Sequence, residues 1–313
     1  MRYRHSSYYS SRYRHRRMTF GEVIRIILLI LIVGMIGFGT FMVYRAVHAE
    51  VILADLKKQN EVLSQTVARY QAVMPDPALT GAAEPLPYQT LYPEMRVAQT
   101  PEVATAKRGT VFLTFEGGPS PHTATILDAL KKSGAHATFF VTGKNIAGNE
   151  ALVKRMVEEG HTVGVSSYSG DYKAIYLSPD AFVEDFHQAY EAIYAACGVY
   201  PTIFRFPGGS VNRYSQNTYQ PIIAEMLRRG FLYYDWSASA NDAESGNRTI
   251  TEVTQTVLTG VQKTKNTPVV WLHDAAEDTA RAMGNLLSEL KKAGYTCEAL
   301  QNTVRPVTFA YPN

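Results

Sequence analysis

The stretch that decides the fold runs from Thr110 to Thr142 and reads TVFLTFEGGPSPHTATILDALKKSGAHATFFVT. It begins with VFLTF, an apolar run whose length and aromatic, β-branched composition are typical of a buried strand. The segment TATILDALKKSG follows with the apolar spacing of a helix, and its last residue, Gly134, is of the type that commonly ends one. A second apolar run, ATFFV, completes a strand–helix–strand unit, which predicts parallel strands.

The same alternation continues to the C-terminus. The further strand candidates are TVGV, TIFRF, FLYYDW, PVVWLH and YTCEAL, and a long helix is predicted from Ser178-Pro179-Asp180, which supplies an N-cap, a proline at the first helical position and an acidic first turn. Gly160, Gly230 and Gly294 each precede the next strand, as helix-ending glycines do. Seven such units predict an α/β fold with a parallel sheet, nearly enough strands to close a barrel.

Polar side chains stand where these strands end, and in such barrels the chemistry gathers at that edge. Five strand ends therefore converge on one predicted site. Its members are Glu116 after the first strand, Ser166 and Tyr168 after the third, Arg205 after the fourth, Asp235 and Asp242 after the fifth, and His273 and Asp274 after the sixth.

The N-terminal residues predict a membrane anchor. Residues 1–25 form a tail with six arginines before Arg25 and no acid before Glu22, and residues 26–44 read IILLILIVGMIGFGTFMVY. A helix of that length spans about 30 Å, the thickness of a bilayer core. The arginines place the tail in the cytoplasm and the rest of the chain outside it. Cleavage after Val47-His48-Ala49, as in a secretory signal peptide, is the alternative, although the apolar run is long for one.

Between the membrane helix and the barrel, the composition predicts two connecting segments. Residues 45–74 carry apolar residues near heptad positions, which predicts a helical stalk that either pairs with a second copy or stays solvated alone. Residues 75–106 contain Pro75, Pro77, Pro85 and Pro87 and predict a linker, so the domain is expected over residues 107–313. The nearly neutral remainder excludes a nucleic-acid surface, and the two cysteines, Cys197 and Cys297, are too few for a disulfide scaffold or a zinc motif.

Five motifs together resemble the polysaccharide deacetylases, the NodB-like carbohydrate esterase family. In order they are TFEGGPS at 114–120, GHTVGVSSYSGDY at 160–172, RFPGG at 205–209, YDWSASANDA at 234–243 and WLHD at 271–274. The resemblance implies a distorted (β/α)7-type barrel. It also implies a hydrolase that removes acetyl groups from chitin-like, xylan or peptidoglycan sugars with the help of a divalent metal, usually zinc.

This chain departs from the family at the metal. The family's first motif places a base aspartate and a metal-binding aspartate where this sequence has Glu116 and Gly117, and its two metal-binding histidines fall on Ser166 and Gly170. Glycine offers no side chain, and a serine hydroxyl is a poor zinc ligand beside imidazole or carboxylate. The sequence therefore predicts a divergent member with no metal cofactor.

Other family positions are retained. The resemblance assigns a general base to Glu116, a base-orienting arginine to Arg205 and a general acid to His273. It assigns the tuning of that histidine to Asp235, although Asp242 lies in the same motif and the register between the two is open. Expected substrate contacts are Tyr168, Pro207, Gly208, Trp236 and Leu272, with Trp271 as a further ring for stacking on a sugar.

Three functions follow from this sequence. The leading one is a degenerate deacetylase domain that binds cell-wall polysaccharide, peptidoglycan or a protein partner without hydrolysis. The alternative is an active hydrolase with a rebuilt zinc or other divalent site, for which His122, His161 and Asp171 are the nearby candidates beside Glu116. A third is a structural element of the envelope that forms a homodimer through the stalk.

Overall fold

The computed structural model describes residues 84–98, 102–243, 247–265 and 267–310, with a few isolated positions before residue 51. The chain divides into two compact units, Met1–Ala83 and Glu84–Asn313, and all the elements below belong to the second. The predicted tail, membrane helix and stalk lie outside the described residues except at those isolated positions, so the anchor and stalk dimer stay predictions. Within the described part of the chain, no helix has both the length and the apolarity to cross a bilayer.

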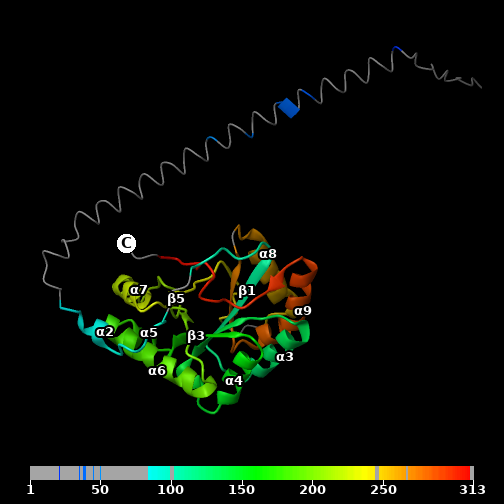
Figure 1. The fold of residues 1–313 in the computed structure, drawn as a ribbon. Helices are drawn as coiled ribbons and strands as arrows, with labels where there is room; N and C mark the ends of the chain where they lie inside the picture. The colour runs from blue at the N-terminus through cyan, green and yellow to red at the C-terminus, as the bar shows by residue number, and fades with distance from the viewer. Residues whose placement is uncertain are drawn as a thin grey trace, which may run out of the picture. The chain divides into compact units, whose positions relative to one another are not determined.

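Helices and strands alternate along the second unit, as the sequence predicts (Figure 1). In chain order they are α2 (Pro87–Thr90), β1 (Thr110–Glu116), α3 (Thr123–Ser133), β2 (Thr138–Thr142), η1 (Gly143–Asn145), α4 (Glu150–Glu158), β3 (Thr162–Ser167), α5 (Tyr172–Ile175), α6 (Pro179–Cys197), β4 (Ile203–Phe204), α7 (Tyr219–Arg228), β5 (Leu232–Tyr233), β6 (Ala238–Ser239), α8 (Ile250–Lys263), β7 (Val269–His273), α9 (Glu277–Lys292) and β8 (Thr296–Cys297). The helix expected from Ser178 is α6, whose first turn is capped by the Ser178 hydroxyl.

Every strand pairing in the sheet is parallel, in the order β5-β4-β3-β2-β1-β7-β6, with β8 beside the start of β1. The fold is therefore an α/β half-barrel, which is the coarse form of the predicted distorted barrel. The two ends of the sheet, β5 and β6, come from one short segment. The Tyr234 N–H bonds to the Phe204 carbonyl beside β4, and the Ser237 N–H bonds to the Val269 carbonyl of β7. This closing segment, residues 232–239, thus contacts both edges of the opening.

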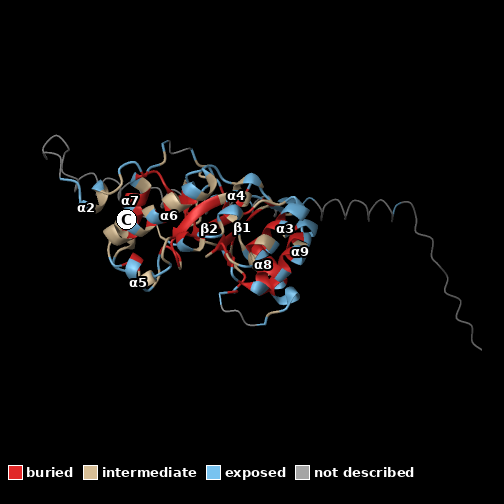
Figure 2. Cartoon of the chain, turned by 90° about the horizontal axis from the view of Figure 1, so that it is seen from below, coloured by how far each residue is buried: buried red, intermediate tan, exposed pale blue. Residues whose placement is uncertain are grey.

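The packing of the sheet explains why apolar and polar residues do not alternate along its strands. β1 and β2 are buried along nearly their whole length because helices cover the outside of the sheet and side chains fill its inside. Helices are buried on one side and exposed on the other, as Figure 2 shows by colour. Aromatic rings fill the part of the core around α6 and β4, where the ring centroid of Phe186 lies 5.5 Å from that of Phe204 and 5.1 Å from that of Phe231.

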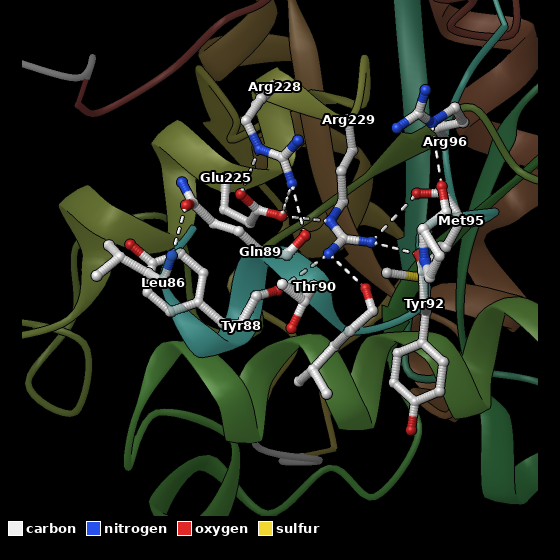
Figure 3. Close-up of polar contacts among 12 residues, drawn as sticks. Leu86, Tyr88, Gln89, Thr90, Tyr92, Met95, Arg96, Glu225, Arg228 and Arg229 are labelled. Carbon is white, nitrogen blue, oxygen red and sulfur yellow. Dashed lines mark hydrogen bonds and ion pairs between the residues drawn. The ribbon is translucent and has the colours of Figure 1, made fainter. Parts of the chain in front are cut away.

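Residues 84–98 are packed against the domain, in contrast to the spacer expected from their prolines. Met95 is completely buried, and α2 lies against α6. The Arg229 guanidinium, at the end of α7, donates hydrogen bonds to the carbonyls of Tyr88, Leu91 and Tyr92 (Figure 3). We call residues 84–98 the strap. The folded unit therefore begins before residue 107, because these carbonyls find buried donors on α7.

The two cysteines do not pair. Both thiols are free, and Cys197 is half-buried while Cys297 is buried. The Cys197 thiol donates to the Ile193 carbonyl one turn earlier in α6, at 3.2 Å. Burial raises the pKa of the Cys297 thiol to about 12, so this thiol stays protonated and unreactive at neutral pH.

Candidate functional site

The candidate site lies at the carboxyl ends of neighbouring parallel strands. Glu116 is the last residue of β1 and His273 the last residue of β7, and the two are paired in register. Arg205 directly follows β4, and β3 and β2 lie between β4 and β1 in the sheet. Parallel strands end on the same side, so residues far apart in sequence meet at one edge.

Glu116 is a buried carboxylate with few partners. Its side chain accepts a hydrogen bond from the Trp271 indole N–H at 2.7 Å, and its Oε2 lies 4.0 Å from Nη1 of Arg205. Burial raises the pKa of Glu116, and the charges of Arg205 and His273 and the Trp271 N–H offset only part of that rise. The Arg205–Glu116 pair expected from the sequence is present, at the long end of ion-pair distances.

Arg205 has no exposed surface and is held mostly by neutral groups. It donates to the Tyr234 carbonyl at 2.8 Å, to the Thr114 hydroxyl at 2.7 Å and to the Asp235 carbonyl at 3.1 Å. Its guanidinium carbon also lies 4.5 Å from the centre of the Phe140 ring. Burial lowers the pKa of Arg205 to about 10, against the pull of Glu116 and Asp235, and the side chain remains charged at neutral pH.

Asp242, and not Asp235, orients His273. The Asp242 carboxylate contacts Nδ1 of His273 at 2.9 Å and accepts the backbone N–H of the same residue at 2.9 Å. It also accepts the Thr279 hydroxyl at 2.5 Å. Although burial alone would raise the pKa of Asp242, these hydrogen bonds and the neighbouring imidazole lower it below its usual value. The contact with Asp242 fixes the orientation of the imidazole, which is one-quarter exposed.

The sequence assigns the orientation of His273 to Asp235, and this assignment is wrong because of where β6 lies. This strand has only two residues and pairs with β7 through Ala238↔Val270 and Ser239↔Trp271. Asp242, three residues after β6, therefore lies beside the end of β7. Asp235 instead accepts the backbone N–H and hydroxyl of Ser210 and the N–H of Phe309, so it joins the RFPGG loop to the C-terminal segment. A strand of two residues, one of them the polar Ser239, has no periodicity from which the sequence could predict it.

The three positions that hold a metal in the family do not form a metal site here. Gly117 and Gly170 adopt left-handed backbone conformations, with φ of +87° and +70°. The side-chain atom nearest to a Cβ placed on Gly170 is Nζ of Lys144, at 3.6 Å, and a lysine ammonium repels a metal cation. Among the described residues, no group of three or more His, Cys, Asp or Glu side chains is arranged to hold a metal ion. The donor set of these positions does not fit zinc.

The substitute ligands considered from the sequence lie in other structural roles. His161 accepts the Ala137 N–H at the start of β3, the end of the strand opposite to the site. Asp171 caps α5 by accepting the N–H groups of Lys173 and Ala174. His122 is the residue before α3, and its charge acts on the buried carboxyl of Asp274.

The expected substrate contacts divide into three groups. Trp236 and Trp271 stack on each other with 4.0 Å between ring centroids, and Trp271 continues to His273 at 4.6 Å. Tyr168 lies over Gly143 instead, and none of its ring contacts within the described residues reaches the tryptophans. Leu272 is completely buried in the core, so the expectation that it touches substrate is corrected.

The RFPGG loop supplies backbone groups to the site. The Gly208 N–H stabilises the ionised form of Glu116. Pro207 is buried, and its carbonyl accepts the Tyr176 hydroxyl at 2.8 Å and the Asn212 amide at 3.2 Å. The loop is therefore fixed by hydrogen bonds from Tyr176, the residue after α5, and from Asn212 in the loop's own continuation, and Gly208 is the part that faces Glu116.

Sequence and structure comparisons agree with this geometry. The family described as polysaccharide deacetylase matches residues 104–222. The peptidoglycan-N-acetylglucosamine deacetylase PgdA of Listeria monocytogenes is 35% identical over 205 residues, which cover 64% of this chain and 40% of that protein. A peptidoglycan-N-acetylglucosamine deacetylase of Bacillus cereus is 30% identical over 66% of this chain and 75% of its own length.

Solved structures give the same result. The catalytic domain of a peptidoglycan N-acetylglucosamine deacetylase from Eubacterium rectale superposes with a TM-score of 0.64 at 33% identity, covering 69% of this chain and 99% of that one. The polysaccharide deacetylase Bc1974 of Bacillus cereus gives 0.59 at 30% identity, over 64% and 97%. The half-barrel, the strand-end residues and these likenesses together show that the chain belongs to the polysaccharide deacetylase family.

Proposed function

We propose that this chain binds an N-acetylated cell-wall polysaccharide such as peptidoglycan at the strand-end site without hydrolysing it. One observation carries the proposal. The site keeps a buried carboxylate beside an arginine and a histidine oriented by Asp242, while two of the three family metal positions are glycines. Relatives named as peptidoglycan deacetylases supply the substrate class.

The chemistry of acetyl removal explains why the residue types matter. Hydrolysis of an amide needs an activated water and a stabiliser for the oxyanion. A bound metal would supply the first by lowering the pKa of its water to about 7, and the second by its positive charge. Glu116 and His273 can exchange protons, but neither replaces that stabilisation. Binding requires only the shape and hydrogen-bonding groups of the site, and these persist in Glu116, His273 and the Gly208 N–H.

An active hydrolase is the second candidate, and the His273–Asp242 pair favours it. A histidine held at 2.9 Å by a buried aspartate is the arrangement of a general acid for a leaving amine. The raised pKa of Glu116 would also suit a base that works near neutral pH. This candidate requires zinc or another divalent ion bound by a ligand set other than the family's.

The deciding experiment uses the purified full-length chain in detergent. Zinc, cobalt and nickel are measured per chain, acetate release is assayed on chitooligosaccharides and peptidoglycan, and oligosaccharide binding is measured by calorimetry. We expect no bound metal, no acetate and measurable binding that Trp271→Ala weakens. The matched control is Tyr200→Ala, an exposed ring at the end of α6 away from the strand ends. About one metal per chain with metal-dependent acetate release would contradict the proposal and favour the hydrolase.

We also propose that the domain is held outside the cytoplasm by a single membrane helix at residues 26–44. The uncharged run flanked by Arg25 and Arg45, and the arginines before it, support this placement. A site close to the membrane surface suits a polymer of the cell wall as ligand.

A further inference from the structure

The C-terminal segment, residues 304–310, lies against the candidate site. The Asp235 N–H donates to the Val307 carbonyl at 2.8 Å, and the Phe309 N–H donates to the Asp235 carboxylate at 2.6 Å. Asp235 is fully buried and is bound at the same time by Ser210. The backbone at Phe309 is therefore fixed to the loop that carries Gly208, the residue facing Glu116.

Phe309, near the end of this segment, carries a half-exposed aromatic ring. Its ring packs edge-on against Trp236, with 4.9 Å between centroids and an interplanar angle of 78°. A Cβ on Gly209 would lie 2.9 Å from Cε2 of Phe309, so only glycine at 209 leaves room for the ring in this position. Despite these contacts, 49% of Phe309 is exposed to solvent.

The ring continues an aromatic row that ends at the site. Phe309 contacts Trp236, Trp236 stacks on Trp271, and Trp271 contacts His273 and donates to Glu116. Within the row, Trp236 has one face on Trp271 and also lies 5.6 Å from the Arg205 guanidinium carbon. Phe309 is the outermost ring of the row and has a large exposed surface. The two tryptophans lie between it and Glu116.

We propose that Phe309 binds a sugar ring of the polysaccharide that lies more than one unit beyond the unit held at Glu116 and His273, and so sets a preference for longer chains. The inference rests on the proposed function. A pyranose ring has an apolar face that packs on an aromatic ring, and an aromatic that is already fixed in place loses little side-chain freedom on binding. The hydrogen bonds to Asp235 provide that fixation.

An oligosaccharide series tests the inference on the full-length chain. Affinities for N-acetylglucosamine oligomers of two and five units are compared between the unaltered chain and Phe309→Ala, Phe309→Leu and Phe309→Trp. We expect Phe309→Ala to weaken binding of the pentamer about tenfold while the dimer changes less than twofold. Phe309→Leu keeps an apolar contact with Trp236 and should still lose the pentamer preference, whereas Phe309→Trp should retain it. Tyr194→Ala, an exposed ring on α6, is the matched control.

Two results would overturn the inference. Equal weakening of dimer and pentamer by Phe309→Leu would mean that the ring only supports the site through Trp236, and an unchanged pentamer affinity would mean that it touches no sugar. Failure of the proposed function gives different readouts. If the chain hydrolyses these oligomers, the same length dependence appears in KM and the inference stands; if the unaltered chain binds neither oligomer, both proposals fall together.

Discussion

At the scale of single residues, the two glycines at former metal positions have backbones that side chains rarely adopt. Both Gly117 and Gly170 have positive φ, so an L-residue there is strained whatever space surrounds it. The absence of metal ligands is thus accompanied by a local backbone conformation that suits glycine. Restoring a ligand side chain would have to overcome this strain in addition to the nearby Lys144 ammonium.

The substitution Gly170→Ala isolates that strain. No atom lies closer than 3.6 Å to the added Cβ, so the methyl group fits and only the φ of +70° opposes it. We expect a loss of about 1 kcal/mol in the free energy of unfolding, measured by urea denaturation. Gly284→Ala is the matched control, because Gly284 lies in α9 with open space around it and should gain about 0.5 to 1 kcal/mol. A neutral or stabilising Gly170→Ala would contradict the prediction.

His161 predicts a pH dependence of stability. Its side chain is 1% exposed, its Nδ1 accepts the Ala137 N–H, and its Nε2 has no hydrogen-bond partner. Burial lowers the pKa of His161 from 6.5 to about 4, with a further contribution from the charge of His136. Between these values the unfolded chain binds the proton and the folded chain does not. Stability should therefore fall as pH decreases from about 6.5 to about 4.

The substitution His161→Asn tests this prediction because asparagine keeps an acceptor for Ala137 but does not titrate. The variant should lose the part of the stability slope due to one proton, at most about 1.4 kcal/mol per pH unit. Urea denaturation at several pH values between 4 and 7 measures it. His136→Asn removes only the smaller of these two contributions to the lowered pKa of His161, so it should reduce the slope less than His161→Asn does. An unchanged slope in His161→Asn would show that this histidine is not the titrating group.

At the scale of elements, the strap depends on one buried ion pair. Arg229 and Glu225 are 2.6 Å apart with exposed fractions of 3% and 0%, and the remaining Arg229 donors reach the carbonyls of residues 88–95 (Figure 3). Removing the guanidinium leaves a buried carboxylate with one remaining partner, Arg228, and leaves the strap carbonyls without their donors.

Arg229→Met should therefore release the strap. We expect a loss of about 3 kcal/mol in the free energy of unfolding, the lower end for breaking a buried pair because Arg228 still contacts Glu225. Limited proteolysis should then cut within residues 84–98 while the rest of the domain stays intact. Arg228→Met is the comparison variant, because Arg228 is 44% exposed and makes one hydrogen bond to the strap, to the Gln89 carbonyl, whereas Arg229 makes four. Its ion pair with Glu225 is screened by solvent, so the expected effect is below about 1 kcal/mol and the strap should stay largely protected. Equal protease resistance in both variants would rule out this role for Arg229.

The elements show where sequence reasoning succeeds. Long apolar runs such as VFLTF and PVVWLH coincide with most of β1 and with β7, and Ser178-Pro179 marks the start of α6, because burial and capping act on neighbouring residues. The sequence predicts a spacer at the strap because Arg229, whose hydrogen bonds hold the strap, is far away in sequence. The sequence does not predict β6 because two residues carry no periodicity. Without β6, the sequence also cannot show that Asp242 contacts His273.

At the scale of the whole molecule, the proposed anchor makes a separate prediction. Leu31→Arg with Met35→Arg places two charges in the middle of residues 26–44, each at a cost of about 2.5 to 3.5 kcal/mol for membrane insertion. The unaltered chain should stay with membranes after alkaline carbonate washing, and the variant should be extracted. Leu56→Arg with Leu63→Arg, in the predicted stalk, should remain in the membrane. Recovery of the unaltered chain in the soluble fraction would contradict the anchor.

The site itself is a whole-molecule property. Its residue types and their position at strand ends follow from sequence because parallel strands end together. Which carboxylate meets which base does not follow, since the distance between Asp235 and Asp242 along the chain says nothing about which strand each one borders. Likewise Phe309 stands outside the motifs, and hydrogen bonds between its segment and Asp235 bring it beside Trp236.

The position of β1 in the middle of the sheet also determines when the site can form during synthesis. Glu116 is paired with His273 through β1 and β7, so the growing chain cannot complete this pair until residue 273 has been made. Until then one edge of β1 has no partner, and such an edge in a nascent chain is open to association with other chains. A polypeptide interrupted between β5 and β7 would therefore keep an exposed apolar edge and aggregate, so the pairing that assembles the site also protects the sheet from association with other chains.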